Sequence, residues 1–325
     1  MTGITKPWRR CVAACLLATL VAPGAAVAQQ GCKPLKIVVP FSAGSGADLL
    51  GRVYAQQLAT QINTSVIVEN KEGAGGMLGA AYVASLPANG CTMLVATTPF
   101  VVGPISQQKN LYKPIEDFTA LPRVAINPLA LAVNAALPAR TLQEFVAYAQ
   151  ANPGKLSYAS SGPGTPSQLD MEHLKSLLGV DIQEIPYKSN AQALQDTVGG
   201  TVSMYYTVQS TTLSNIRAGK LKALGVGAAR PTKALPDVPT IAAAASLPGY
   251  EALIWYGFVV RAGTPRDAID HLSVEIAKAS QASGVVEGIE KGGFEISPST
   301  PAEFASQMAQ EAKKWTAIVK GQAPK

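Results

Sequence analysis

Short hydrophobic runs alternate along the chain with longer segments in which apolar residues have helical spacing. The first short run ends at Val39, and the longer segment that follows begins at Asp48. Its apolar positions recur at steps of three and four residues: Leu49, Leu50, Val53, Tyr54 and Leu58. The short run predicts a buried strand and the spaced segment predicts a helix. The small residues and glycines between them predict a tight turn that leads directly into that helix.

The same alternation continues to about residue 97. Strands are predicted at residues 36–40, 65–69 and 92–97. A second glycine-rich turn, 73–76, precedes a helix of small residues at 77–86. Short apolar strands that alternate with helices favour a mainly parallel sheet covered by helices on its faces.

The second half of the chain repeats this order. Residues 122–133 are predicted to be extended and to cross into a second lobe, and the apolar run 255–260 is predicted to return to the first. Between them, strands are expected at 156–160, 182–185, 202–206 and 223–226, with helices at 141–152, up to 178, 191–198 and 211–217. Helices at 266–280 and 301–319 end the chain. We therefore expect residues 29–124 and 254–325 to form lobe 1 and residues 125–253 to form lobe 2.

Residues 1–28 have the pattern of a cleaved secretory signal peptide. Lys6, Arg9 and Arg10 precede an apolar run at 11–22, and Ala26-Val27-Ala28 forms a small-residue cleavage site that leaves Gln29 first. A lipoprotein box at 12–15 and a twin-arginine signal are the weaker alternatives. An exported, periplasmic protein is therefore expected.

Loss of the signal changes the charge and hydropathy of the chain. Lys and Arg fall from 27 to 24 against 21 Asp and Glu, and no basic cluster remains. Nucleic acid is therefore an unsuitable partner. No later apolar run reaches the roughly 18 residues that span a bilayer, so the mature protein is expected to be soluble.

Cys32 and Cys91 are the two cysteines that remain after the signal. An even pair in an oxidising compartment favours a disulfide over a metal site. Each cysteine stands just before a predicted strand, and parallel strands begin at one edge of a sheet. The two residues are therefore expected to lie close enough to form the bond.

The chemistry of the chain favours binding over catalysis. His173 and His271 lie far apart in sequence without metal-ligand spacing, and no G-x-S-x-G nucleophile motif occurs. The glycines at 73–79 do not fit the dinucleotide pattern G-x-G-x-x-G. We therefore expect no catalytic residue, metal or organic cofactor. A glycine-rich turn before a helix instead suits an anion, because the first helical N–H groups lack partners and carry partial positive charge.

Seven motifs occur in an order that resembles one protein family. They are IVVPFSAGSGADLLGR, VIVENKEGAGGMLGA, YASSGPGTPS, GVDIQEIPYK, ARPTKALPDVPT, PGYEALIWYGFV and AGTPRDAIDHL. Together they resemble the Bug (TctC-like) family, the periplasmic solute-binding receptors of tripartite tricarboxylate transporters. The resemblance implies a type II periplasmic-binding-protein (Venus flytrap) fold with two α/β lobes and two crossing segments. It also implies a small carboxylate ligand, a membrane permease as partner and a monomer.

The resemblance also implies the ligand-binding residues. They are Phe41, Ser42, Ala43, Gly44, Ser45, Gly46, Asp48, Gly75, Gly76, Met77, Thr97, Thr98, Ser160, Ser161, Gly164, Thr165 and Tyr206. The chain departs from the family pattern at Ser42, Ala43, Ser45, Gln168 and Ser203-Met204, which leaves the choice of carboxylate open.

The candidate loops contain no Arg or His, and Lys71 is the nearest cation in sequence. Backbone N–H groups of residues 43–46 and 75–77, with nearby hydroxyls, are therefore expected to hold the acid. Segments 122–129 and 249–255 are expected to form the hinge. A binding module for a signalling sensor, or an exported enzyme, remains as an alternative function.

Overall fold

The computed structural model describes residues 1–3, 32–107, 111–162, 164–187 and 189–319. The predicted signal sequence and its cleavage site therefore lie outside the described residues, apart from the first three. The folded part of the described chain begins at Cys32. Within it, no helix combines the length and the apolar character that crossing a membrane requires.

Lobe 1 is built on a mixed sheet that contains the first three strands. They are β1 (Leu35–Val39), β2 (Val66–Asn70) and β3 (Thr92–Thr97), and both β2 and β3 pair parallel with β1. The sheet continues from β3 to the antiparallel strand β9 (Leu253–Arg261). Its helices are α1 (Gly46–Gln61), η1 (Ala74–Gly76), α2 (Met77–Ser85), α3 (Thr98–Ser106), α9 (Arg266–Ala279), α10 (Ser283–Lys291) and α11 (Pro301–Val319).

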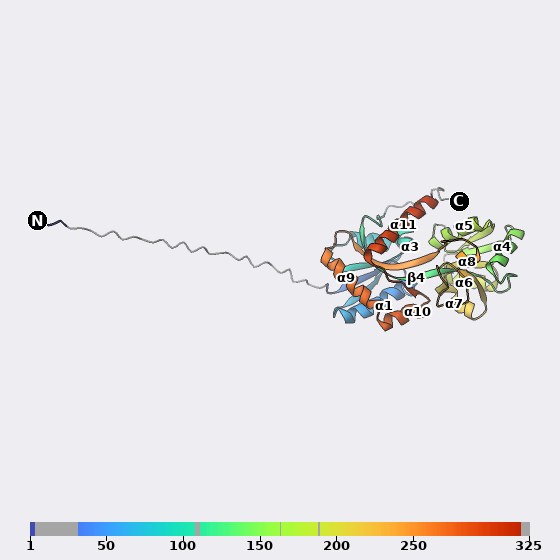
Figure 1. The fold of residues 1–325 in the computed structure, drawn as a ribbon, viewed down its shortest axis with the longest axis horizontal. Helices are drawn as coiled ribbons and strands as arrows, with labels where there is room; N and C mark the ends of the chain where they lie inside the picture. Colours follow the sequence, from blue (N-terminus) through green and yellow to red (C-terminus); the bar gives the residue numbers. More distant parts are fainter. Residues whose placement is uncertain (4–31, 108–110, 163, 188, 320–325) are drawn as a thin grey trace. The chain divides into compact units, whose positions relative to one another are not determined.

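One long strand, β4 (Phe118–Asn134), belongs to both lobes (Figure 1). Its first part pairs with β9 as far as Pro128, and its second part pairs with strands of lobe 2 from Leu129 onward. The short strand β10 (Glu295–Ile296) also pairs with its first part. Because β9 lies beside β4 at the crossing, two adjacent strands connect the lobes.

Lobe 2 repeats the parallel arrangement around β5. Its strands are β5 (Leu156–Ser160), β6 (Ile182–Pro186), β7 (Met204–Val208) and β8 (Leu221–Val226). Strand β5 pairs parallel with β6 and β7, and β7 and β8 pair antiparallel with β4. Its helices are α4 (Leu142–Ala151), α5 (Pro166–Leu178), α6 (Asn190–Gly199), α7 (Gln209–Arg217) and α8 (Ile241–Ala244).

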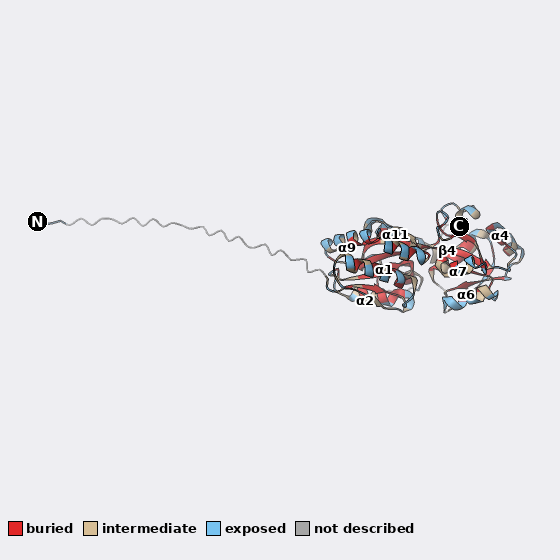
Figure 2. Ribbon diagram, turned by 90° about the horizontal axis from the view of Figure 1, so that it is seen from below, coloured by how far each residue is buried: buried red, intermediate tan, exposed pale blue. Residues whose placement is uncertain are grey.

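The central strands are buried between helices (Figure 2), whereas the edge strands β2 and β6 are largely only half-buried or exposed. In β1, alternate side chains point to opposite faces. Ile37 and Val39 therefore join the core that packs under α1, α9 and α10, whereas Val38 joins the core under α2, α3 and α11. This two-sided burial explains why central strands such as β1 are continuous apolar runs. The two-lobed α/β fold expected from the sequence is confirmed, and the crossing strands add antiparallel pairs to it.

Two details of the helices differ from the sequence prediction. Helix α1 begins at Gly46 and not at Asp48, because Ser45 is the N-cap and its Oγ accepts a hydrogen bond from the Asp48 N–H. Helices α3, α8 and α10 were not predicted. In α3, Pro99 lies in the first turn, where a missing N–H leaves no helical bond unmade.

The predicted disulfide between Cys32 and Cys91 is present, and it precedes two adjacent parallel strands. It closes a loop of 59 residues, for which chain entropy gives about 4 kcal/mol of stabilisation. Reduction should therefore lower the free energy of unfolding by up to about that amount. Thiol titration of the denatured, unreduced protein without its signal should detect no free thiol, and two thiols per chain would contradict the pairing.

Candidate functional site

A cavity of about 570 Å³ lies between the two lobes, and residues of both lobes line it. The first loop contributes Ser45 and Gly46, and the facing loop after β5 contributes Ser161 and Thr165. Both loops follow the carboxyl ends of parallel strands. This is where ligands bind in open α/β sheets.

Among the described residues, five helices begin at this cavity. First-turn or N-cap residues that line it come from α1, α3, α5, α6 and α7: Gly46, Thr97, Pro166, Asn190 and Ser210. The first N–H groups of each helix have no intrahelical acceptor, and the helix dipole adds partial positive charge there. The cavity is therefore surrounded by backbone donors that favour an anion.

The described residues that line the cavity include no Lys, Arg, His, Asp or Glu. The Lys71 ammonium is instead 2.8 Å from a carboxylate oxygen of Glu69. Lys109 and Lys188 stand two positions from the lining residues Gln107 and Asn190 in the sequence but lie outside the described residues. The positive character that the structure gives this cavity therefore comes from backbone dipoles.

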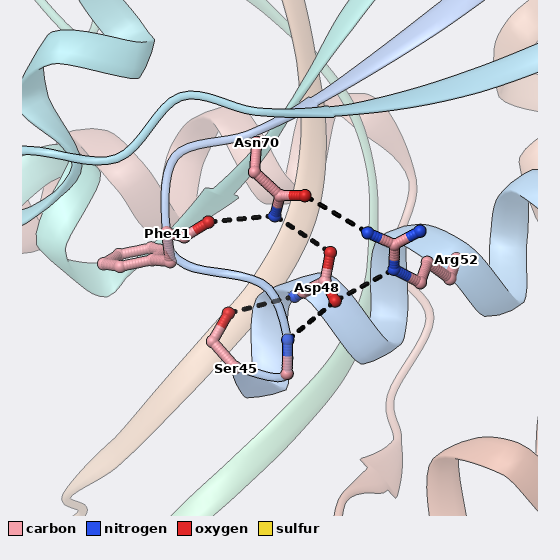
Figure 3. A network of polar contacts seen from close by, with 6 residues as sticks. Phe41, Ser45, Asp48, Arg52 and Asn70 are labelled. Atoms are coloured by element: carbon pink, nitrogen blue, oxygen red, sulfur yellow. Dashed lines mark hydrogen bonds and ion pairs between the residues drawn. The ribbon is translucent and has the colours of Figure 1, made fainter.

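Asp48 stabilises the first loop through hydrogen bonds (Figure 3). Its buried carboxylate accepts hydrogen bonds from the Gly44 N–H, Asn70 Nδ2 and Arg52 Nε, each at 2.9 Å. Burial opposes its ionisation, but the hydrogen bonds from Arg52, Gly44 and Asn70 outweigh burial and lower the pKa of Asp48. Asp48 was expected among the ligand contacts, but it is not among the residues that line the cavity. Its hydrogen bonds fix the shape of the loop instead.

The same network decides which N–H groups of the first loop remain for a ligand. The Gly44 N–H is bound to Asp48, and the Ser45 N–H donates to the Ser42 carbonyl at 3.2 Å. Gly46 and Ala47, the first two residues of α1, line the cavity, and their N–H groups have no acceptor within the helix. The available donors are therefore shifted toward the helix from the expected 43–46 row, and Ser42 and Ala43 are not among the lining residues.

In the second loop, only Gly75 lines the cavity among the three residues expected there. The N–H groups of Gly76 and Met77 donate to the carbonyls of Gly73 and Ala74 within the turn. These two residues therefore shape the loop, and their amides are already hydrogen-bonded.

Thr97 and Thr98, both expected in the site, have different environments. Thr97 lines the cavity, and its buried hydroxyl has no hydrogen-bond partner among the described residues. A buried, unsatisfied hydroxyl is costly unless a ligand or water completes it. The Thr98 hydroxyl instead accepts the Trp255 N–H at 3.2 Å, which connects α3 to β9.

The facing loop is held in the same way as the first. The Gly164 N–H donates to Gln168 Oε1 at 3.1 Å, four residues ahead, just as Gly44 donates to Asp48. Ser161, Gly164 and Thr165 line the cavity, whereas the Ser160 hydroxyl accepts the Gly162 N–H inside the loop. Gln168, one of the departures from the family pattern, is thus a loop-supporting residue.

Strand β7 places Tyr206 away from the cavity. Tyr206 is 1% exposed, and its hydroxyl lies 3.0 Å from that of Tyr250 in the core of lobe 2. Its neighbour Thr207 lines the cavity instead. Successive side chains of a strand point to opposite faces, so only one of the two can reach the ligand.

An apolar wall beside the α1 N-terminus was not predicted from the sequence. We define it as Phe41, Ile254, Tyr256 and Phe294, which all line the cavity. The rings of Tyr256 and Phe294 meet edge to face with centroids 5.0 Å apart. Phe294 packs so closely on α1 that a Cβ on Gly46 would lie 2.7 Å from its ring. Phe41 was among the expected ligand-binding residues and Tyr256 lies on a predicted strand, whereas Phe294 had no sequence signal.

The fold and this site define a class. A two-lobed α/β molecule with two crossing strands, and with a cavity between the lobes at the helix starts, is a type II periplasmic binding protein. The chain belongs to the tripartite tricarboxylate transporter receptor family (TctC), whose profile matches residues 50–323. The family resemblance seen in the sequence is therefore confirmed.

Three relatives illustrate this membership. The protein BugT of Bordetella pertussis is 30% identical over 290 residues, which cover 89% of each chain. A Rhodopseudomonas palustris protein solved with adipate is 28% identical with a TM-score of 0.79, covering 89% of this chain and 97% of that one. MatC from the same species, solved with bound malate, is 28% identical with a TM-score of 0.75, covering 88% and 99%.

Proposed function

We propose that this protein captures a small carboxylate in the periplasm and delivers it to a membrane permease of the tripartite tricarboxylate type. The observation that carries the proposal is a cavity at which five described helices begin and whose described lining residues carry no charge. Hydrogen bonds to an ionised acceptor contribute roughly 1.5–3 kcal/mol each, so a few aligned amides are enough for useful affinity. The relatives solved with adipate and malate support a carboxylate.

The apolar wall indicates which part of the ligand lies next to the carboxylate. The Phe294 ring and the Tyr256 hydroxyl lie next to Gly46 at the N-terminus of α1, and Phe41 adds a second ring to the lining. Burying a methylene against such a surface contributes about 0.8 kcal/mol. The favoured ligand is therefore a carboxylate with a hydrocarbon body, and adipate should bind more tightly than the shorter, hydroxylated malate.

Calorimetry with adipate, malate and adipamide tests this function. Adipamide has the same carbon chain but no negative charge, so it should fail to bind if amide dipoles select an anion. Equal binding of adipate and adipamide would contradict an anion site.

Two further experiments identify the ligand and the partner. Native mass spectrometry of freshly purified protein would show any retained ligand. Co-purification with a permease or with a sensor ectodomain distinguishes transport from signalling.

Binding should depend little on Lys71 and little on salt. The Lys71 ammonium already pairs with Glu69 and does not line the cavity. Buried dipoles are also screened less than exposed charges. Lys71→Ala should therefore change the Kd for adipate less than about twofold, a change within the range of exposed ion pairs. A steep loss of affinity with salt would contradict the amide site and direct attention to Lys109 and Lys188.

A further inference from the structure

A second cavity, of about 300 Å³, lies on the opposite side of the crossing strands. We call it the hinge-side cavity. Along β9, Ile254 and Tyr256 line the ligand cavity, whereas Leu253 lines the hinge-side cavity. Similarly, Thr97 lines the ligand cavity and Thr98 lines the hinge-side cavity. Because alternate side chains of a strand face opposite ways, the crossing strands separate the two cavities.

Residues from both lobes line the hinge-side cavity. Lobe 2 contributes Asp170 of α5, and lobe 1 contributes Glu311 and Lys314 of α11. Arg123 of the crossing strand β4 and Glu251 are the other charged residues of the lining, and the Arg123 guanidinium donates to Ser297 and Gln307. Asp170 lies one turn into the same helix whose N-terminus lines the ligand cavity. Helix α5 therefore reaches both cavities.

Asp170 is only 3% exposed and lines the hinge-side cavity. Burial raises the pKa of Asp170 to about 7; the Lys314 ammonium opposes this rise and Glu311 adds to it. Burial also raises the pKa of Glu311. The other titratable or charged groups around it are Tyr206, Tyr250, Glu251, Arg123 and His173.

We propose that Asp170 and Lys314 set the balance between open and closed lobes from the side opposite the ligand. When two lobes bend about crossing strands, narrowing one side widens the other. Closure over the ligand therefore separates α5 from α11 and admits water to Asp170. Contacts across the hinge-side cavity favour the open form. An ionised carboxylate buried there opposes that form, because burial penalises the charged state.

The direction of the pH effect follows from this geometry. The described structure, which we take as the open form, holds Asp170 buried with its raised pKa. Closure exposes the carboxylate and returns its pKa to the ordinary value. The open form is therefore favoured as pH falls through about 7 and disfavoured above it. With those two pKa values, the closed-to-open ratio should rise about tenfold between pH 6 and pH 8. Ligand affinity should rise by the same factor while the open form predominates.

Single-molecule energy transfer on the ligand-free protein tests this proposal. Dyes on Lys220→Cys in lobe 2 and Ala277→Cys in lobe 1 occupy exposed positions. In the wild type, the closed fraction should rise about tenfold from pH 6 to pH 8. In Asp170→Asn it should stay at its low-pH value, whereas Asp237→Asn, on an exposed loop, should behave as wild type. His173→Gln should keep the pH dependence, which separates Asp170 from the nearby histidine.

A second variant distinguishes an electrostatic effect on Asp170 from a general structural effect of the substitution. Lys314→Met removes the cation that opposes the raised pKa of Asp170, so the midpoint of the pH profile should move upward. Lys313→Met, the exposed neighbour, should leave the midpoint unchanged. A pH-independent distribution in the wild type, an opposite direction, or an unchanged response in Asp170→Asn would overturn the proposal. Because no ligand is present, these results stand apart from the proposed function, on which only the consequence for affinity rests.

Discussion

Asp48→Ala is expected to lower the free energy of unfolding by about 3 kcal/mol and to abolish measurable ligand binding. The substitution removes the acceptor of three hydrogen bonds, from Gly44, Asn70 and Arg52. The Gly44 N–H and the Asn70 amide are then left unsatisfied beneath the first loop. Without these hydrogen bonds to Asp48, the loop is no longer fixed, and Gly46 and Ala47 lose their defined positions at the cavity. Urea unfolding and calorimetry with adipate measure the two effects.

The chain contains a matched control for this substitution. Arg266 and Asp270 form an ion pair with the same spacing of four residues, but both side chains are more than half exposed. Asp270→Ala should therefore cost less than about 0.5 kcal/mol and leave binding unchanged. If Asp48→Ala behaved like Asp270→Ala, the network in Figure 3 would not be what holds the loop.

The Asp48 network also has a defined pH dependence. Because its folded-state pKa lies below the ordinary value of 3.8, Asp48 contributes stability above that value. The contribution is lost as pH falls through the folded-state pKa. The difference in stability between wild type and Asp48→Asn should therefore persist from neutral pH to about pH 4 and shrink in stronger acid.

Much of the fold could be predicted because its signals are local. The predicted bounds of β3, β5 and α11 coincide with those in the structure. Helix α3 was missed because it is apolar on all sides, contains Pro99 and Pro104, and offers no polar face from which a helical period can be recognised. Such a helix is stabilised by its tertiary surroundings, chiefly the packing of Phe100 in the core.

The candidate site shows the same division between local and distant causes. Glycines, helix caps and loop hydroxyls are encoded locally, so the two facing loops that line the cavity could be located from the sequence. Tyr206 and Thr207 could not be distinguished, because β7 is buried on both faces and alternation alone does not say which face meets the ligand. Phe294 reaches Gly46 only through the fold, since the two residues are 248 positions apart.

Gly46→Pro is expected to weaken adipate binding by about 10- to 100-fold relative to Gly46→Ala, because it deletes one N–H donor at the start of α1. Proline is well tolerated at the first position of a helix, where its N–H is not needed for helical bonding. Ser45 already has the extended conformation, φ −70° and ψ 162°, that a residue before proline requires. The helix should therefore form in both variants.

The comparison with Gly46→Ala isolates the donor, because both variants place a Cβ against the Phe294 ring and only proline also removes the N–H. Each should be measured by calorimetry with adipate, after thermal unfolding has shown that the two variants are equally stable. The donor accounts for the loss if alanine retains most of the wild-type affinity while proline does not. Equal losses in the two variants would instead show that crowding of Phe294, and not the missing hydrogen bond, controls binding. In that case the apolar wall would be the main determinant of affinity, and the anion would be held by the amides of the other helices that begin at the cavity.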